Sequence, residues 1–172
     1  MADKPFLYYD RLKLWDIIII TIYLIFSISV FIIYRYGSNE FVLSVALAHI
    51  VCSQIFSFIF LYRLLRNFSF YLIWFGFAIL HAVMYFLLIG NRQFEAEDVK
   101  PFPVFLNTIV LLLIFQVLRY FSLKIQKREF EFPASRAPYK MPGEIESSAI
   151  DGLVLIIYFV SLFVLFRIDR LL

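Results

Sequence analysis

Long apolar runs alternate with short polar segments along this chain. The apolar runs cover residues 15–34, 41–62, 70–90, 104–123 and 150–166. A helix of about 20 residues crosses the roughly 30 Å hydrocarbon layer of a bilayer, and the last run is at the short limit for a span. We therefore expect an all-α fold, a polytopic membrane helical bundle with five transmembrane helices. The alternative is four spans plus a re-entrant C-terminal segment.

The composition agrees with this pattern. Hydrophobic residues make up 63% of the 172 residues and aromatic residues 20%, whereas soluble domains are about 45–50% apolar. We therefore interpret residues 1–172 as a single integral membrane domain. The net charge of +3 is small, and the basic residues follow the loops, so the charge does not indicate a nucleic-acid partner. The single cysteine, Cys52, excludes an internal disulfide framework.

The runs 41–62 and 70–90 form the most informative part of the pattern. Residues 63–69, which join them, allow only a tight connection, so the two helices should be antiparallel neighbours. Small residues recur every four positions on both arms, which favours close helix packing. These small-residue ridges are Ser44, Ala48 and Cys52 on the first arm, and Ala78 and Ala82 on the second.

Both histidines lie in this hairpin. Helical rise places His49 and His81 about 12 and 14 Å below the same membrane face, and Cys52 follows His49 by one helical turn. The three side chains could therefore converge on a metal, a haem or a proton path, since ionisable groups inside a membrane are functional candidates. The structural alternative is that the histidines are neutral and hydrogen-bonded between helices. Haem between the arms meets a geometric difficulty, because packed helices lie only about 8–10 Å apart.

Other polar groups fall near the ends of the predicted spans. Arg119 lies about 6 Å short of the boundary of its span, with Gln116 three residues away on the same face. They could bind an anionic headgroup or a carboxylate, with Asp16 and Asp151 at the same level. The alternatives are snorkelling of Arg119 to the surface and pairing between helices. Asp16 itself has a simpler explanation, a carboxylate favoured by the dipole at the start of the first helix.

The longest loop, 124–148, contains three prolines and several apolar residues. The prolines forbid one continuous helix, and the apolar residues indicate a segment that lies on the membrane face or against a partner. Ser148-x-x-Asp151 has the spacing of a capping box at the start of the last helix.

The positions of the basic residues predict the topology. Residues 1–14, 63–69 and 124–148 contain ten Lys and Arg, and the segments on the other side contain five. Because cytoplasmic loops are enriched in Lys and Arg, we expect a cytoplasmic N-terminus, a cytoplasmic loop 124–148 and an external C-terminus. The plasma membrane is the default location for such a protein.

The chain has no catalytic, nucleotide-binding or metalloprotease signature. We therefore predict no catalytic residues, no metal site and no cofactor, with haem as the alternative, and the cofactor-binding residues stay unknown. Three function classes remain. The first is a non-catalytic structural or accessory subunit, or an assembly factor, with membrane lipids and other integral membrane proteins or copies of itself as partners. The second is a small transporter or lipid-handling protein. The third is a redox carrier with a bis-histidine haem. The intramembrane polar candidates are His49, Cys52, His81, Gln116, Arg119 and Asp151.

Overall fold

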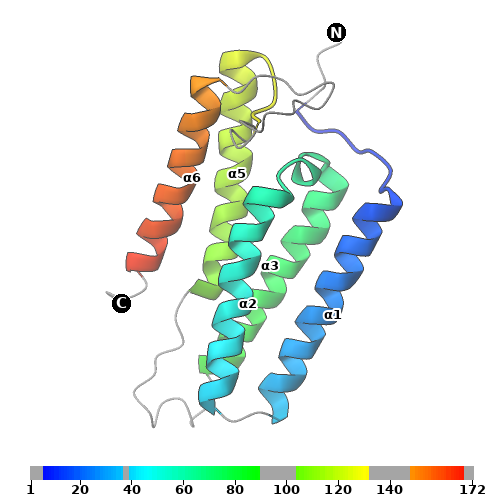
Figure 1. The fold of residues 1–172 in the computed structure, drawn as a ribbon, viewed down its shortest axis with the longest axis vertical. Helices are drawn as coiled ribbons and strands as arrows, with labels where there is room; N and C mark the ends of the chain where they lie inside the picture. The colour runs from blue at the N-terminus through cyan, green and yellow to red at the C-terminus, as the bar shows by residue number, and fades with distance from the viewer. Residues whose placement is uncertain (1–5, 37–38, 90–103, 132–147, 169–172) are drawn as a thin grey trace, which may run out of the picture. The chain divides into compact units, whose positions relative to one another are not determined.

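The computed structural model describes residues 6–36, 39–89, 104–131 and 148–168. Within these ranges the fold is all-helical and contains no strand, which confirms the predicted fold class at this level (Figure 1). The helices end within three residues of the predicted runs. They are α1 Leu14–Tyr36, α2 Asn39–Phe60, α3 Phe68–Ile89, α5 Val104–Gln126 and α6 Ala149–Ile168, with a short 3₁₀ helix η1 at Leu64–Arg66.

Four of the five described α-helices are long and apolar enough to cross a membrane: α1, α3, α5 and α6. In α2 the corresponding apolar stretch is shorter, Ser44–Phe60. The last predicted run becomes a helix of 20 residues, so its length is compatible with a span. These lengths and compositions suggest an integral membrane protein, while the count of five spans stays a prediction.

The chain divides into two compact units. The N-terminal unit, Leu7–Ile109, contains α1, α2, η1, α3 and the first residues of α5. The C-terminal unit contains Val110–Leu172 together with Met1–Phe6, and therefore the rest of α5 and α6. The single membrane domain expected for residues 1–172 stays a prediction.

Within the N-terminal unit, α2 and α3 form the expected antiparallel hairpin. The chain reverses through η1, whose Leu65 and Arg66 are buried. Trp74 Nε1 on α3 donates a hydrogen bond of 2.7 Å to Ser57 Oγ on α2. The short connection and this contact together confirm that the two helices are neighbours.

The segment before α1 is attached to the connection between α2 and α3. The carbonyl of Tyr8 accepts a hydrogen bond from the Phe68 amide at 3.0 Å, and Asn67 Nδ2 donates to the carbonyl of Asp10 at 2.9 Å. At the start of α1 the buried Asp16 carboxylate accepts the amide N–H of Lys13 at 2.8 Å. Asp16 is therefore a helix-start carboxylate, as its position at the start of the run predicted.

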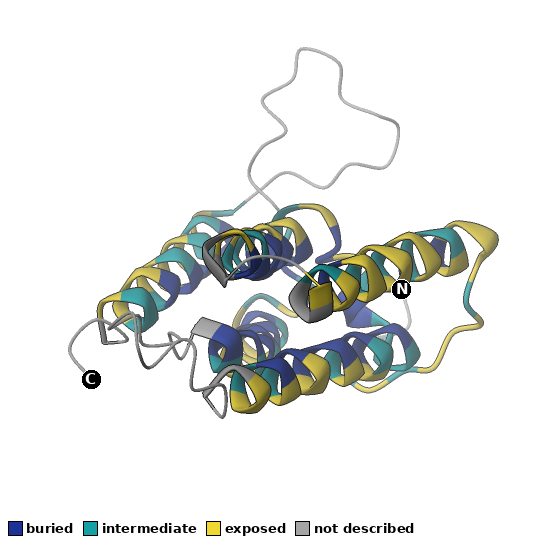
Figure 2. Cartoon of the chain, turned by 90° about the horizontal axis from the view of Figure 1, so that it is seen from below, coloured by how far each residue is buried: buried dark blue, intermediate teal, exposed yellow. Residues whose placement is uncertain are grey.

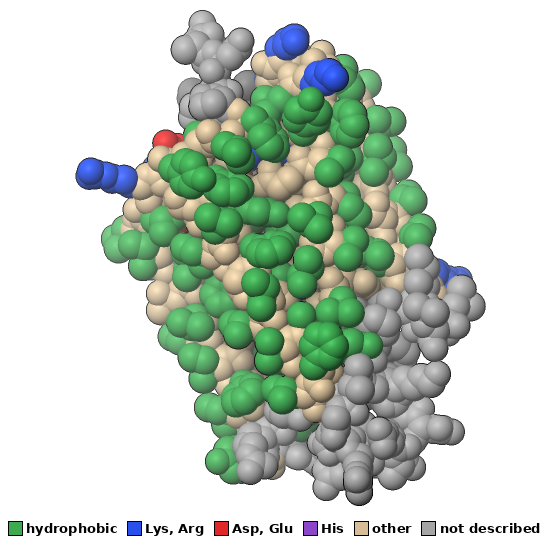
Figure 3. All heavy atoms as spheres, turned by 180° about the vertical axis from the view of Figure 1, so that it is seen from behind, with side chains coloured by type: hydrophobic (Ala, Val, Ile, Leu, Met, Phe, Trp, Pro, Cys, Tyr) green, Lys and Arg blue, Asp and Glu red, His purple; other side chains and the backbone are tan. Residues whose placement is uncertain are grey.

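Apolar side chains cover much of the outer surface of the helices. Figure 2 shows exposed positions along each helix, and the face seen in Figure 3 is covered mainly by hydrophobic side chains. An apolar exterior suits lipid, because lipid tails are as apolar as the side chains that they touch.

The small residues of the hairpin do not all face inward. On α3, Ala78 is completely buried and Ala82 is partly buried. On α2, by contrast, Ser44, Ala48 and Cys52 are exposed, and the buried small residues are Ala46, Ser53 and Ser57. The predicted α2 ridge is therefore exposed within the described part of this chain.

Candidate functional site

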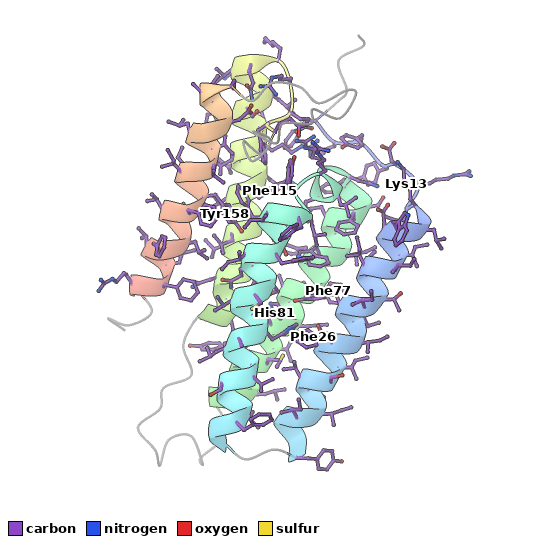
Figure 4. All side chains as sticks on the ribbon, viewed as in Figure 1. Lys13, Phe26, Phe77, His81, Phe115 and Tyr158 are labelled. Atoms are coloured by element: carbon purple, nitrogen blue, oxygen red, sulfur yellow. The ribbon has the colours of Figure 1, made fainter. Side chains whose placement is uncertain are left out.

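The N-terminal unit contains a buried polar cluster to which four helices contribute. His81 on α3 is its centre: the Nε2 atom lies 2.9 Å from the Tyr23 hydroxyl on α1, and the Nδ1 atom lies 3.1 Å from Thr108 Oγ1 on α5. Gln54 on α2 donates from Nε2 to the same Thr108 oxygen at 3.0 Å. His81 and Thr108 are buried, and Figure 4 shows His81 near the middle of α3. The cluster thus connects α1, α2, α3 and the start of α5 through uncharged groups.

His49 lies beside this centre. Its imidazole ring is 5.5 Å from that of His81, at an interplanar angle of 85°, as expected for side chains at one depth. The Tyr23 ring stacks on His49 at 5.3 Å, and the Phe26 ring contacts it edge-on at 4.8 Å. The hydroxyl of Ser27 is 3.4 Å from His49 Nε2.

The convergence of the two histidines is confirmed, but Cys52 does not join them. His49 is buried whereas the Cys52 side chain is exposed, because the three-residue step between them turns the thiol to the outer side of α2. Of the two alternatives that the sequence left open, a site formed by all three side chains is therefore wrong. Within the described residues, no three His, Cys, Asp or Glu side chains lie together in a way that could hold a metal ion.

The histidine pair does not fit a haem in this arrangement. A bis-histidine haem places a flat porphyrin between two imidazoles that both point a nitrogen at the iron. Here the two rings are perpendicular and their centroids are only 5.5 Å apart, while both nitrogens of His81 are already hydrogen-bonded. Tyr23 and Phe26 occupy the faces and edges of His49. The helices would have to separate before a macrocycle could enter.

The C-terminal unit contains a second polar site, and this one is ionic. Arg119 on α5 has no exposed surface, and its Nε and Nη2 atoms donate to the Glu129 carboxylate at 2.6–3.0 Å. Gln116 Oε1 lies 3.5 Å from Arg119 Nη1, and the Phe6 ring lies 4.9 Å from the guanidinium carbon. The predicted alternative in which Arg119 snorkels to the membrane surface is therefore wrong. The guanidinium forms an ion pair inside the unit, with a carboxylate that follows α5 rather than with Asp151.

Asp151 joins several parts of the same unit. The Ser148 amide donates to Oδ2 at 2.8 Å, and Ser148 Oγ accepts the Asp151 amide at 3.3 Å, which confirms the predicted capping box. The carboxylate also accepts from Arg128 at 2.7 Å, from Gln126 at 2.9 Å and from the Glu131 amide at 3.2 Å. One buried carboxylate thereby holds the start of α6, the end of α5 and the segment after it.

The backbone after α5 explains why these charges meet. Lys127 has a φ of 55°, the left-handed conformation that often ends a helix. The chain then turns back, and Phe130 is buried against Phe115 with ring centroids 5.6 Å apart. This reversal brings Glu129 to Arg119 and Arg128 to Asp151. The rest of the loop, 132–147, lies outside the described residues, so its predicted position on the membrane face stays a prediction.

Sequence reasoning missed Tyr23, Thr108 and Glu129 as partners of the named candidates. Tyr23 and Thr108 lie in apolar runs without any distinctive spacing, so only the orientation of their helices identifies them. Glu129 sits in a loop of mixed charge. Its distance of ten residues from Arg119 gives no helical signal.

Comparisons of the chain with protein-family models, with curated proteins and with solved structures find no significant match. The two sites must therefore be interpreted from their own chemistry. The site in the N-terminal unit consists of neutral hydrogen bonds, and the site in the C-terminal unit consists of ion pairs.

Proposed function

We propose that this chain is a non-catalytic multi-pass membrane protein that packs against other integral membrane proteins, as a structural or accessory subunit or as an assembly factor. The observation that carries the proposal is that His81, Arg119 and Asp151, three of the polar side chains singled out by the sequence, each bind partners within their own unit. Arg119 pairs with Glu129, Asp151 pairs with Arg128, and both nitrogens of His81 are hydrogen-bonded.

Such a distribution is typical of groups that fix helices in position. A polar side chain in lipid is costly unless it has a partner, and partners on neighbouring helices determine which helix faces which. A substrate site would instead need polar groups directed to an open space or a water-filled path. Internal pairing therefore favours a structural role for these residues.

The exposed face of α2 supports the proposal of a protein partner. Ser44, Ala48 and Cys52 lie on it at four-residue spacing and are exposed, and small residues at this spacing let a second helix approach closely. Lipid alone requires no small residues at these positions. Because the described residues of the chain leave this ridge exposed, a helix of another protein or of a second copy is the occupant that we propose.

The two alternative functions have less support. A headgroup-binding or transport role for Arg119 and Gln116 would require the Glu129 carboxylate to be displaced from the guanidinium. A redox role would require the histidine pair to separate around a haem. The redox role is tested by an optical spectrum of the purified protein, compared with spectra of His49→Ala and His81→Ala. A Soret band that disappears in both variants would replace our proposal with a redox carrier.

The proposal is tested by co-purification from membranes in mild detergent. Ala48→Leu should remove a co-purifying membrane protein, or the second copy, that the wild-type chain retains, because a larger side chain blocks close helix approach. Ser29→Leu on α1 is the matched control, since Ser29 is also an exposed small residue. Loss of partners in both variants or in neither would contradict the proposed interface.

We further propose five spans, with the N-terminus and loop 124–148 in the cytoplasm and the plasma membrane as the location. The support is the excess of Lys and Arg in the segments assigned to the inside. Single cysteines introduced in a Cys52→Ala background at Glu97, Ala134 and Leu172, all outside the described residues, test this topology. An external thiol reagent should label the first and third positions, and labelling at Ala134 would reverse the orientation.

A further inference from the structure

The imidazole Nδ1 of His49, a buried nitrogen atom in the N-terminal unit, has no hydrogen-bond partner among the described residues. The His49 side chain is only 3% exposed, so bulk solvent does not reach the atom. Leaving a buried polar atom without a partner costs about 1–3 kcal/mol. Such atoms are rare in folded proteins and call for a specific explanation.

The neighbouring hydrogen bonds determine which form of His49 is present. The Ser27 hydroxyl gives its single hydrogen to the carbonyl of Tyr23, 2.9 Å away, so towards His49 Nε2 its oxygen can only accept. His49 Nε2 must therefore carry the ring proton. It follows that Nδ1 presents an unprotonated lone pair, which needs a donor.

His81 provides an internal comparison. The Gln54 amide donates to Thr108 Oγ1, which leaves the Thr108 hydrogen for His81 Nδ1. His81 Nε2 then carries the proton and donates to the Tyr23 oxygen. Both histidines are thus the same tautomer, but only His81 has a partner for its lone pair.

The surroundings determine the charge of a suitable ligand. His49 is in ring contact with Tyr23, Phe26 and His81, all uncharged groups. Residues 17–33, 41–60, 68–89 and 104–118 contain no Asp, Glu, Lys or Arg. A cation bound in this place would have no counter-charge nearby, and charges deep in a membrane are expensive.

We propose that the N-terminal unit binds one small neutral hydrogen-bond donor, of the size of water or ammonia, at the Nδ1 lone pair of His49. The shared chemistry is an O–H or N–H group that donates to the imidazole inside a cage of aromatic rings. This site is separate from the structural role of the helices, and it gives His49 a function that His81 does not have.

Nitrogen NMR of the protein in lipid bilayers, with ¹⁵N-labelled histidine, tests the proposal. The chain has two histidines, so four ring-nitrogen resonances arise, which His49→Leu and His81→Leu assign. We expect His49 Nδ1 to be unprotonated. Its chemical shift should move from the value of an imidazole nitrogen that accepts no hydrogen bond towards the value of His81 Nδ1. A chemical shift equal to that of an imidazole nitrogen that accepts no hydrogen bond, or a protonated Nδ1, would overturn the proposal.

The same samples distinguish the two sources of the donor. Transfer of magnetisation from water protons to His49 Nδ1 identifies bound water. A different neutral solute is identified by two results together. The resonance receives no magnetisation from water, and after extensive dialysis its chemical shift returns to that of an imidazole nitrogen that accepts no hydrogen bond. In that case ammonia added back at alkaline pH should restore the shift.

Discussion

The two units accommodate buried polar groups in different ways. In the N-terminal unit the cluster around His81 is neutral, with His81 bonded to Tyr23 and Thr108, and the buried charged residues Asp16 and Arg66 lie at the start of α1 and in η1. In the C-terminal unit the groups are charged and lie near helix ends. There Arg119 is within eight residues of the end of α5, and Asp151 is in the first turn of α6.

This difference follows from the cost of charge in a membrane. At the middle of a span an ion is expensive even when it is paired, whereas neutral hydrogen bonds between helices cost little and contribute about 0.6 kcal/mol each. Near helix ends a buried ion pair is tolerable when additional groups complete its hydrogen bonds, as Gln126 and the Ser148 amide do for Asp151. We therefore expect single substitutions to be most harmful in the C-terminal unit, where the buried groups form ion pairs.

The largest effect is expected for Glu129→Ala. It leaves the Arg119 guanidinium buried without its carboxylate, and breaking a buried pair in this way costs about 3–5 kcal/mol. Unfolding of the purified protein in a denaturing detergent measures the loss. The double variant Arg119→Met with Glu129→Met should lose much less, because it removes both charges. Equal losses in the single and double variants would mean that the pair is not buried as described.

Asp151→Ala should have the next largest effect, about 2 kcal/mol, because it removes the helix cap and a charged hydrogen bond to Arg128. Asp151→Asn is the control. Asparagine is a good capping residue but has no charge, so it should retain part of the lost stability. If both variants were as stable as the wild type, the carboxylate would not hold the segment after α5.

Packing in the N-terminal unit gives an effect of intermediate size. Ala78→Leu places three extra carbon atoms where the side chain has no exposed surface, and overpacking typically costs about 1–3 kcal/mol. Ala48→Leu on the exposed face of α2 should change the stability of the isolated chain by less than about 0.5 kcal/mol. Thermal unfolding of the two variants should separate them clearly, and a reversed order would contradict the orientation of α2.

Apart from the change at the exposed Ala48, the smallest effect is expected for Tyr23→Phe, which removes one hydroxyl from the neutral cluster. The loss should be about 0.6 kcal/mol, the average for a hydrogen bond between membrane helices. A double-mutant cycle with His81→Leu should return a coupling of that size. A coupling of several kcal/mol would show that the neutral cluster stabilises the fold as strongly as the ion pairs, and the contrast between the units would disappear.

The sequence was sufficient for features that depend on neighbours along the chain. Hydropathy located the five described α-helices to within three residues, because the length of an apolar run determines the length of the helix. The spacing Ser148-x-x-Asp151 predicted the cap, and helical rise placed His49 and His81 at one depth. Each of these follows from local geometry that is the same in any fold.

Which side of each helix faces inward was decided only by the tertiary structure. The helices are apolar all round, so periodicity could not distinguish the buried Ala46 from the exposed Ala48, or turn Cys52 away from His49. The partner of Arg119 likewise depended on a chain reversal at Lys127 that brings Glu129 back to α5. In a soluble helix the contrast between core and solvent marks the inward face. In lipid both faces are apolar, and the rotation of each helix is determined by contacts with side chains that are remote in the sequence.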